Sequence, residues 1–227
     1  MAMLFHGRSR LSASRTVLVT SAVVTAVIIG VRQTGFLQPL ELSGFDQLTR
    51  LRPSEKPDDR LLIVGIHDQD SHARETPLTD RTVRLLLENL EALAPRAIGL
   101  DIIRDVPVGS GKNTILEYLQ LLETMQRTER LIAVCRVRDR FDHGFLPPGG
   151  LKADQIGAVN LEADPDGILR RALLTVLPPT NASGEAASVC EDSDAALGFG
   201  LQLALRYLNV EGIALERSSN GSLKLGS

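Results

Sequence analysis

The segment 67–72 brings four side chains that can bind metals close together, because Asp68 and Asp70 lie between His67 and His72. Carboxylate oxygens and imidazole nitrogens at such short spacing could hold a hard or borderline cation. The spacing of a calcium-binding loop is absent, however, and acidic residues in loops commonly serve only to keep a turn solvated. A polar loop is therefore the alternative to a metal site.

More charged residues occupy the equivalent position along a second apolar segment, 97–103. Asp101 lies in this segment, and Arg104 and Asp105 follow it, much as Asp68 and Asp70 follow the apolar segment 61–66. If both segments are parallel strands, their carboxyl ends meet at one edge of a sheet, where open sheets bind ligands. We therefore expect one ligand-binding crevice lined by Asp68, Asp70, Asp101, Arg104 and Asp105.

Asp101 also has a structural interpretation. Within an apolar strand its carboxylate needs a donor, which would be Arg104, Arg170, Arg171 or backbone amides of the loop that contains Asp68. Arg170 and Arg171 follow an Asp-Pro-Asp-Gly turn at 164–167, and a guanidinium there could bind a ligand carboxylate in fork geometry. A structural ion pair with an aspartate of that turn, or with Asp101, is favoured over an anion site for these arginines.

Two catalytic signatures fail in this chain. The segment 109–113, Gly-Ser-Gly-Lys-Asn, follows an expected strand like a phosphate-binding loop, but the glycine spacing is wrong and Asn113 replaces the hydroxyl that would bind magnesium. No Gly-x-Ser-x-Gly motif is present, and Cys135 lies among apolar residues, a poor setting for a reactive thiolate. Cys135 and Cys190 could instead form a disulfide in an oxidising compartment.

The elements that must position these residues follow from the apolar pattern. Predicted strands alternate with predicted helices, and these elements span 61–66, 79–93, 97–103, 115–125 and 131–137. Short strands that are apolar on both faces and alternate with helices are typical of a parallel sheet covered on both sides. The predicted fold class is thus α/β, a three-layer domain built on a parallel sheet.

A different pattern follows this unit. Strands at 157–161 and 168–176 flank the turn at 164–167 and predict an added β-hairpin. A helix is expected at about 195–208, and the last segment, 213–225, has Asn-Gly between strand-like flanks. The chain therefore looks C-terminally truncated, ending in or just after a second hairpin.

The amino-terminal segment predicts a membrane anchor. Residues 16–31 carry no charge and follow Arg8, Arg10 and Arg15, and no acidic residue occurs before Glu41. The positive-inside rule then makes 1–15 a cytoplasmic arm and 16–34 a transmembrane signal-anchor helix, with 35–227 outside the cytoplasm. A cleavable signal peptide is the alternative, although no small-x-small pair closes the apolar run. An amphipathic helix at 36–51 would continue from the membrane.

The composition of the exported part narrows the function classes. From Gln33 onward the chain carries 28 acidic side chains against 21 basic ones. This acidic balance argues against nucleic acid as a partner, because nucleic-acid binding needs a basic surface. No Cys or His spacing resembles a zinc site, and no cofactor is indicated.

An ordered set of short motifs resembles the second CHASE-type family, whose name stands for cyclases/histidine kinases associated sensory extracellular. The matching residues are Leu40-Glu41 with Phe45-Asp46 and Arg50, 62–66 with Asp68, 95–102, 164–167 with Arg170-Arg171, and 201–204. The resemblance implies an extracytoplasmic sensory domain that returns through further membrane helices to a cytoplasmic effector, usually a histidine kinase, a nucleotide cyclase or a Ser/Thr kinase. The segment 77–81 departs from the family and keeps only Pro77 and Arg81 as counterparts.

We therefore predict a membrane-anchored sensory input domain, not itself an enzyme, in the plasma (inner) membrane with its main domain periplasmic. Its partners would be the membrane, an unknown stimulus and an effector outside this chain, and a homodimer is an option. The ligand-binding candidates are Asp68, Asp70, Asp101, Arg104, Asp105 and Arg170. The alternatives are a membrane-anchored metal-dependent hydrolase that uses Asp68, Asp70 and Asp101, and a structural domain that binds a partner.

Overall fold

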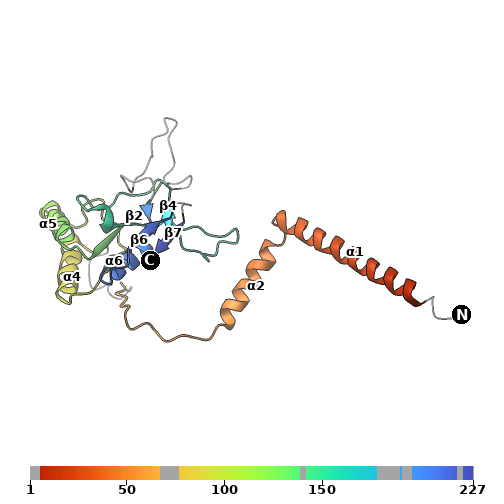
Figure 1. The fold of residues 1–227 in the computed structure, drawn as a ribbon. Helices are drawn as coiled ribbons and strands as arrows, with labels where there is room; N and C mark the ends of the chain where they lie inside the picture. Colours follow the sequence, from red (N-terminus) through yellow and green to blue (C-terminus); the bar gives the residue numbers. More distant parts are fainter. Residues whose placement is uncertain are drawn as a thin grey trace. The chain divides into compact units, whose positions relative to one another are not determined.

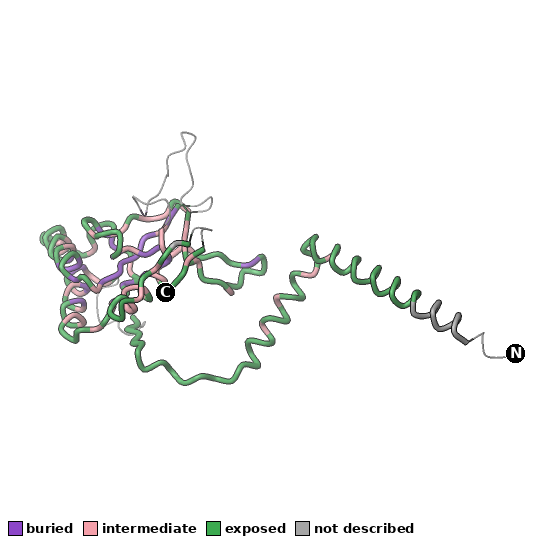
Figure 2. The backbone as a smooth tube through the Cα atoms, in the orientation of Figure 1, coloured by how far each residue is buried: buried purple, intermediate pink, exposed green. Residues whose placement is uncertain are grey.

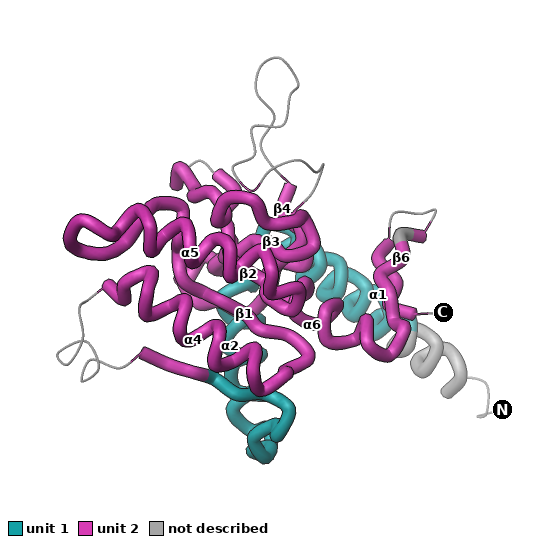
Figure 3. The backbone as a smooth tube through the Cα atoms, turned by 90° about the vertical axis from the view of Figure 1, so that its left-hand side faces the viewer, with its two compact units in different colours: residues 1–63 teal, residues 64–227 magenta. Residues whose placement is uncertain are grey.

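The chain, seen in a computed structural model, divides into two compact units, Met1–Ile63 and Val64–Ser227 (Figure 3). The structure describes residues 6–66, 77–138, 142–177, 190, 196–218 and 222–226. The predicted metal-binding segment, with Asp68 and Asp70, lies outside the described residues.

The first unit consists of two helices and an extended segment (Figure 1). Helix α1 spans His6–Gln33 and contains one stretch, Arg15–Gln33, that is long and apolar enough to cross a membrane. Helix α2 spans Gln38–Leu51 and begins with a proline, which suits the first turn because its missing N–H would have no helical partner there. The predicted helix at 36–51 is confirmed.

The apolar segment 61–66 is not a strand in the structure, so the prediction of a first strand there is wrong. The backbone belongs to none of the described sheets, and its side chains are exposed, with Ile63 91% accessible (Figure 2). An apolar run indicates that a segment prefers burial, but a strand forms only where a neighbouring backbone accepts and donates its hydrogen bonds. In the described part of the chain this segment has no such neighbour.

The second unit is built on a three-stranded parallel sheet. Strands β1 (Ile98–Leu100), β2 (Leu131–Cys135) and β3 (Ile156–Ala158) lie in that order. The register places Ile98 beside Leu131 and Ala133 beside Ile156. All five residues of β2 are buried, as expected for the central strand of a sheet covered on both faces. The parallel sheet is confirmed.

Helices α4 (Asp80–Ala92) and α5 (Thr114–Arg127) cover one face of this sheet and pack side by side (Figure 1). Their apolar stripes meet alternate residues of the strands in one core, which contains Val83, Leu87, Ile98, Leu100, Leu121, Met125 and Leu131. Thr79 caps α4 by accepting a hydrogen bond from the backbone N–H of Thr82. These two predicted helices are confirmed.

Helix α6 (Phe199–Asn209) covers the opposite face. Gly99 lies between Ile98 and Leu100, so its missing side chain points to the other side of the sheet, and a Cβ there would lie 2.8 Å from Leu203. A Cβ on Gly157 would lie 2.6 Å from the Cα of Phe199. The two glycines thus let α6 approach the sheet closely, which completes the three-layer arrangement.

The predicted first hairpin is wrong. Strand β3 pairs with β2, and β4 (Thr175–Val176) pairs antiparallel with β5 (Ala196–Leu197). The predicted turn at 164–167 exists, since the N–H of Gly167 donates to the carbonyl of Asp164 at 2.8 Å. In the described residues, however, the strands β3 and β4 on either side of this turn do not pair with each other. A short 3-10 helix, Ala153–Gln155, leads into β3 instead.

The end of the chain agrees with the prediction of a second hairpin. Strands β6 (Leu215–Arg217) and β7 (Leu223–Leu225) pair antiparallel, with Leu215 opposite Leu225. The predicted helix before them is confirmed as α6, although it begins at Phe199, after Gly198 has packed against the carbonyl of Leu173.

Candidate functional site

The charged residues predicted for the carboxyl edge of the sheet do not share one environment. Asp101 directly follows β1 and is exposed, and Asp105 is exposed as well. Arg104, between them in the chain, is 4% accessible and therefore buried. Asp68 and Asp70 lie outside the described residues.

The buried partner of Arg104 is Asp80, the first residue of α4. The Nε of Arg104 lies 3.2 Å from the Oδ1 of Asp80, whose side chain is fully buried. The same two atoms make no hydrogen bond, so their contact is an ion pair without hydrogen-bond geometry. A buried charge needs a counter-charge, and each residue supplies one for the other.

Three further hydrogen bonds turn this pair into a clamp between the start of α4 and the segment that follows β1. The other carboxylate oxygen of Asp80 accepts from the backbone N–H of Val108 at 2.7 Å, and the backbone N–H of Asp80 donates to the carbonyl of Val108 at 2.9 Å. Arg104 donates to the carbonyl of Leu78 at 2.6 Å. The clamp therefore fixes the start of α4 to the segment that follows Asp101 in the chain.

Tyr118 of α5 lies over the same segment. Its hydroxyl donates to the carbonyls of Arg104 and Asp105 at 3.3 Å. Burial raises the pKa of Asp80 above its ordinary 3.8 and lowers the pKa of Arg104, because it disfavours the charged form of each side chain. Burial likewise raises the pKa of Tyr118, so its hydroxyl keeps the proton that it donates.

Arg170 has a separate role at the turn 164–167. It donates to Asp164 at 2.9 Å and to Asp166 at 2.7 Å, while Arg171 donates to the other oxygen of Asp164 at 2.7 Å. Hydrogen bonding to Arg170 lowers the pKa of both carboxyls, that of Asp166 to about 2. Arg170 thus makes the structural ion pair with the turn that the sequence favours over an anion site.

The structural interpretation of Asp101 as a buried, paired residue is wrong. Strand β1 ends at Leu100, so Asp101 leaves the ladder and its side chain reaches solvent. The arginines named as its donors bind other carboxylates, Asp80 in the case of Arg104 and the turn aspartates in the case of Arg170 and Arg171.

Cys135 at the end of β2 is joined to Cys190 by a disulfide, with 5.4 Å between the two Cα atoms. Both residues are buried with Val137 and Ala158 in a second small core. The bond ties Cys190 to the end of the central strand of the sheet, and the predicted disulfide is confirmed.

A metal site in the described part of the chain would need several ligating side chains close together. Among the described residues, no group of three or more His, Cys, Asp or Glu side chains comes together as a metal would require. The segment 109–113 is exposed and leads into α5, with the hydroxyl of Thr114 donating to the carbonyl of Gly111 at 3.0 Å. The arrangement as described can position exposed carboxylates beside a clamped loop.

Sequence reasoning missed the Asp80 and Arg104 pair. In the sequence, Asp80 looks like an ordinary acid in the first turn of a helix, where a negative charge favours the helix dipole. Its partner lies 24 positions away, and only an arginine close behind an apolar strand hinted at a buried counter-charge.

Residues 23–225 match the CHASE2 domain family, and the chain belongs to this family. CHASE2 domains are sensory domains of signalling receptors. No curated protein and no solved structure is significantly similar to the chain. The resemblance seen in the short motifs is therefore confirmed over most of the sequence.

Proposed function

We propose that the chain is the extracytoplasmic input domain of a membrane-bound receptor and passes an environmental stimulus to a cytoplasmic effector carried outside this chain. The observation that supports this most is the family match, which begins inside the apolar stretch Arg15–Gln33 and continues through the α/β unit. An apolar helix preceded by Arg8, Arg10 and Arg15 favours a cytoplasmic amino terminus.

The stimulus would bind at the carboxyl edge of the sheet. Asp101 and Asp105 are the exposed carboxylates there, and Arg104 between them acts as a positioning residue because Asp80 holds it. Asp68 and Asp70 stay in the proposal only as residues predicted from the sequence, because they lie outside the described residues. Arg170 keeps its role in the turn.

Transmission needs two arrangements of the domain that bind the stimulus differently, because a ligand shifts only such an equilibrium. The clamp between Asp80 and Val108 is a candidate for the element that differs, since it joins the proposed site to the start of α4. The metal-dependent hydrolase is not favoured by any observation in the described part of the chain.

Paired reporter fusions test the proposed orientation. A reporter that is active only outside the cytoplasm and one that is active only inside would each be joined after Arg52. We expect activity from the external reporter alone, in the membrane fraction. Replacement of Arg8, Arg10 and Arg15 by glutamate is the matched control and should weaken this preference. Activity from the cytoplasmic reporter alone would refute the orientation, and release of the external reporter in soluble form would indicate a cleaved signal peptide.

Purified chain then separates the sensor from the hydrolase. A sensor should bind a small molecule without changing it, whereas metal-dependent phosphoesterase activity that disappears in Asp101→Asn would favour the enzyme and contradict the proposal.

A further inference from the structure

Helix α2 has an apolar face that nothing in the first unit covers. No residue of α2 is buried. Leu40, Phe45, Leu48 and Leu51 are 53% to 78% accessible, and they share one side of the helix because they recur at helical spacing. Such an exposed apolar strip is typical of a surface that binds a protein or a membrane.

The helix starts directly where the candidate membrane span ends. Only four residues separate α1 from α2, and Gly35 among them has a positive φ of 77°, which breaks the helix and starts α2 in a new direction (Figure 1). The corner is held by an ion pair of 2.9 Å between Arg32 and Glu41.

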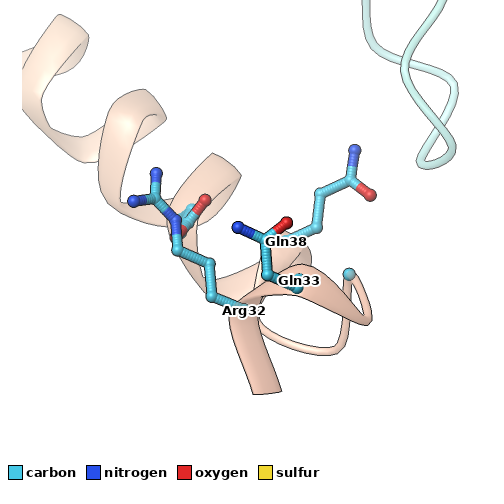
Figure 4. A pocket seen from close by; sticks show the side chains of 5 residues that line it. Arg32, Gln33 and Gln38 are labelled. Atoms are coloured by element: carbon cyan, nitrogen blue, oxygen red, sulfur yellow. The ribbon is translucent and has the colours of Figure 1, made fainter. Parts of the chain in front are cut away.

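Figure 4 shows this corner from close by, with Arg32, Gln33 and Gln38. These side chains line an open hollow of about 360 Å³. Gln33 is the last residue of α1 and Gln38 the first of α2, so polar side chains surround the point where the chain leaves the apolar span. Glu41 lies on the same side of α2 as Leu48, two turns before it, and its carboxylate is paired with Arg32 at the corner.

Length and composition exclude a second crossing of the membrane. Helix α2 has 14 residues and is about 21 Å long at the usual rise, shorter than an apolar bilayer core. Its other side carries Ser43, Asp46 and Arg50. Beyond Leu51 the chain becomes polar, with charged residues and prolines at 52–60, so the apolar strip ends with the helix.

We infer that α2 is an interfacial helix that lies along the lipid surface, with Leu40, Phe45, Leu48 and Leu51 buried in the headgroup region. The inference rests on the proposed anchoring by α1. This anchor would hold α2 at the membrane surface in every molecule, so that lipid is always available to its apolar face. Amphipathic helices of this kind bury their apolar face about 5–10 Å into the boundary between headgroups and acyl chains. A second copy of the chain is the competing occupant.

Site-specific fluorescent labelling of the full chain in lipid vesicles tests this inference. The two native cysteines are joined in a disulfide, so an introduced cysteine is the only thiol to label. Leu48→Cys puts the label on the apolar face, and Ser43→Cys is the matched control, because five residues turn it to the other side of the helix, about 140° away. Val24→Cys labels the middle of α1.

We expect the label in Leu48→Cys to be quenched by lipid-borne nitroxide and to lose most of its quenching by an aqueous collider, compared with Ser43→Cys. Equal aqueous quenching at both positions would overturn the inference. Leu48→Cys chains that crosslink to one another and escape lipid quenching would also overturn it, in favour of a second copy. If the label in Val24→Cys is not in lipid, the anchoring itself fails; if only Leu48→Cys is aqueous, the anchoring stands and the interfacial helix does not.

Discussion

Among the polar interactions of the second unit, we expect the stability of the fold to depend most on the buried pair of Asp80 and Arg104. In Asp80→Ala the guanidinium of Arg104 stays buried at 4% accessibility without its counter-charge, and the N–H of Val108 loses its acceptor. Breaking a buried ion pair from one side costs about 3–5 kcal/mol of unfolding free energy. We expect a loss in this range.

The double variant Asp80→Leu with Arg104→Leu gives the sharper result. It removes both charges, so the remaining cost is that of the unpaired backbone groups of Val108 and Leu78 together with changed packing. The losses of the matching single variants, Asp80→Leu and Arg104→Leu, should therefore add up to more than the loss of the double variant, with a coupling of about 0.5–3 kcal/mol. If the single losses simply add, the two side chains do not act as a pair and the proposed clamp is refuted.

Urea titration of the chain in mild detergent, followed by circular dichroism, measures these values. Glu88→Gln breaks the surface pair of Glu88 with Arg84 on the same helix and serves as the matched control, with an expected change of at most about 0.5 kcal/mol. Asp80→Asn is the milder alternative if Asp80→Ala does not fold, because it keeps an acceptor for Val108.

The pH dependence of stability provides a check with a defined sign. The pKa of Asp80 is raised in the folded state, so its contribution is fully present below its ordinary value of 3.8 and is lost as pH rises through the raised value. Asp80→Asn should abolish this decline. An unchanged decline in that variant would show that Asp80 titrates normally.

Three further outcomes follow from other parts of the second unit. The pKa of Asp166 is lowered to about 2, so its contribution to stability is present above pH 3.8 and is lost as pH falls toward 2. The urea midpoint should therefore fall over this range in the wild type and change less in Asp166→Asn. An equally steep fall in Asp166→Asn would contradict this. Gly157→Ala forces a Cβ to within 2.6 Å of α6 and should lower stability by about 1–3 kcal/mol, whereas Gly200→Ala in open space should not, and equal effects would refute the close packing. Cys190→Ser removes a crosslink across 55 residues and should cost about 2–4 kcal/mol, a loss that reductant should reproduce in the wild type.

The local sequence pattern predicted the helices and strands of the domain better than it predicted which strands pair. Apolar periodicity indicated α4, α5 and α6 and the strands β1 and β2, because the pattern of apolar residues along each element shows which of its faces become buried, whatever they pack against. The segment 61–66 has the same apolar character as β2, but its hydrogen-bonding partner is a tertiary property that the segment itself does not encode. The turn at 164–167 was predicted from its residue types, while the strands that pair beyond it depend on long-range contacts.

In the candidate site, too, the features that depend on local sequence were predicted and those that depend on long-range contacts were not. The prediction of charged residues at the carboxyl edge of the sheet required only the strand ends, and the exposed Asp101 directly follows β1 there. The burial of Arg104 against Asp80 depends on how α4 packs on the loop after β1, which no spacing in the sequence specifies. The binding of a stimulus at this edge remains a prediction.

The proposed export of the sensory domain is tested most directly by thiol labelling in whole cells. The reagent must pass the outer envelope but not the inner membrane, so that it reaches only thiols outside the cytoplasm. Lys112→Cys places a thiol on an exposed loop of the α/β unit, and Ser9→Cys places one in the proposed cytoplasmic arm. We predict that Lys112→Cys is labelled in intact cells and that Ser9→Cys is labelled only after lysis. Labelling of Ser9→Cys but not Lys112→Cys in intact cells would contradict the account.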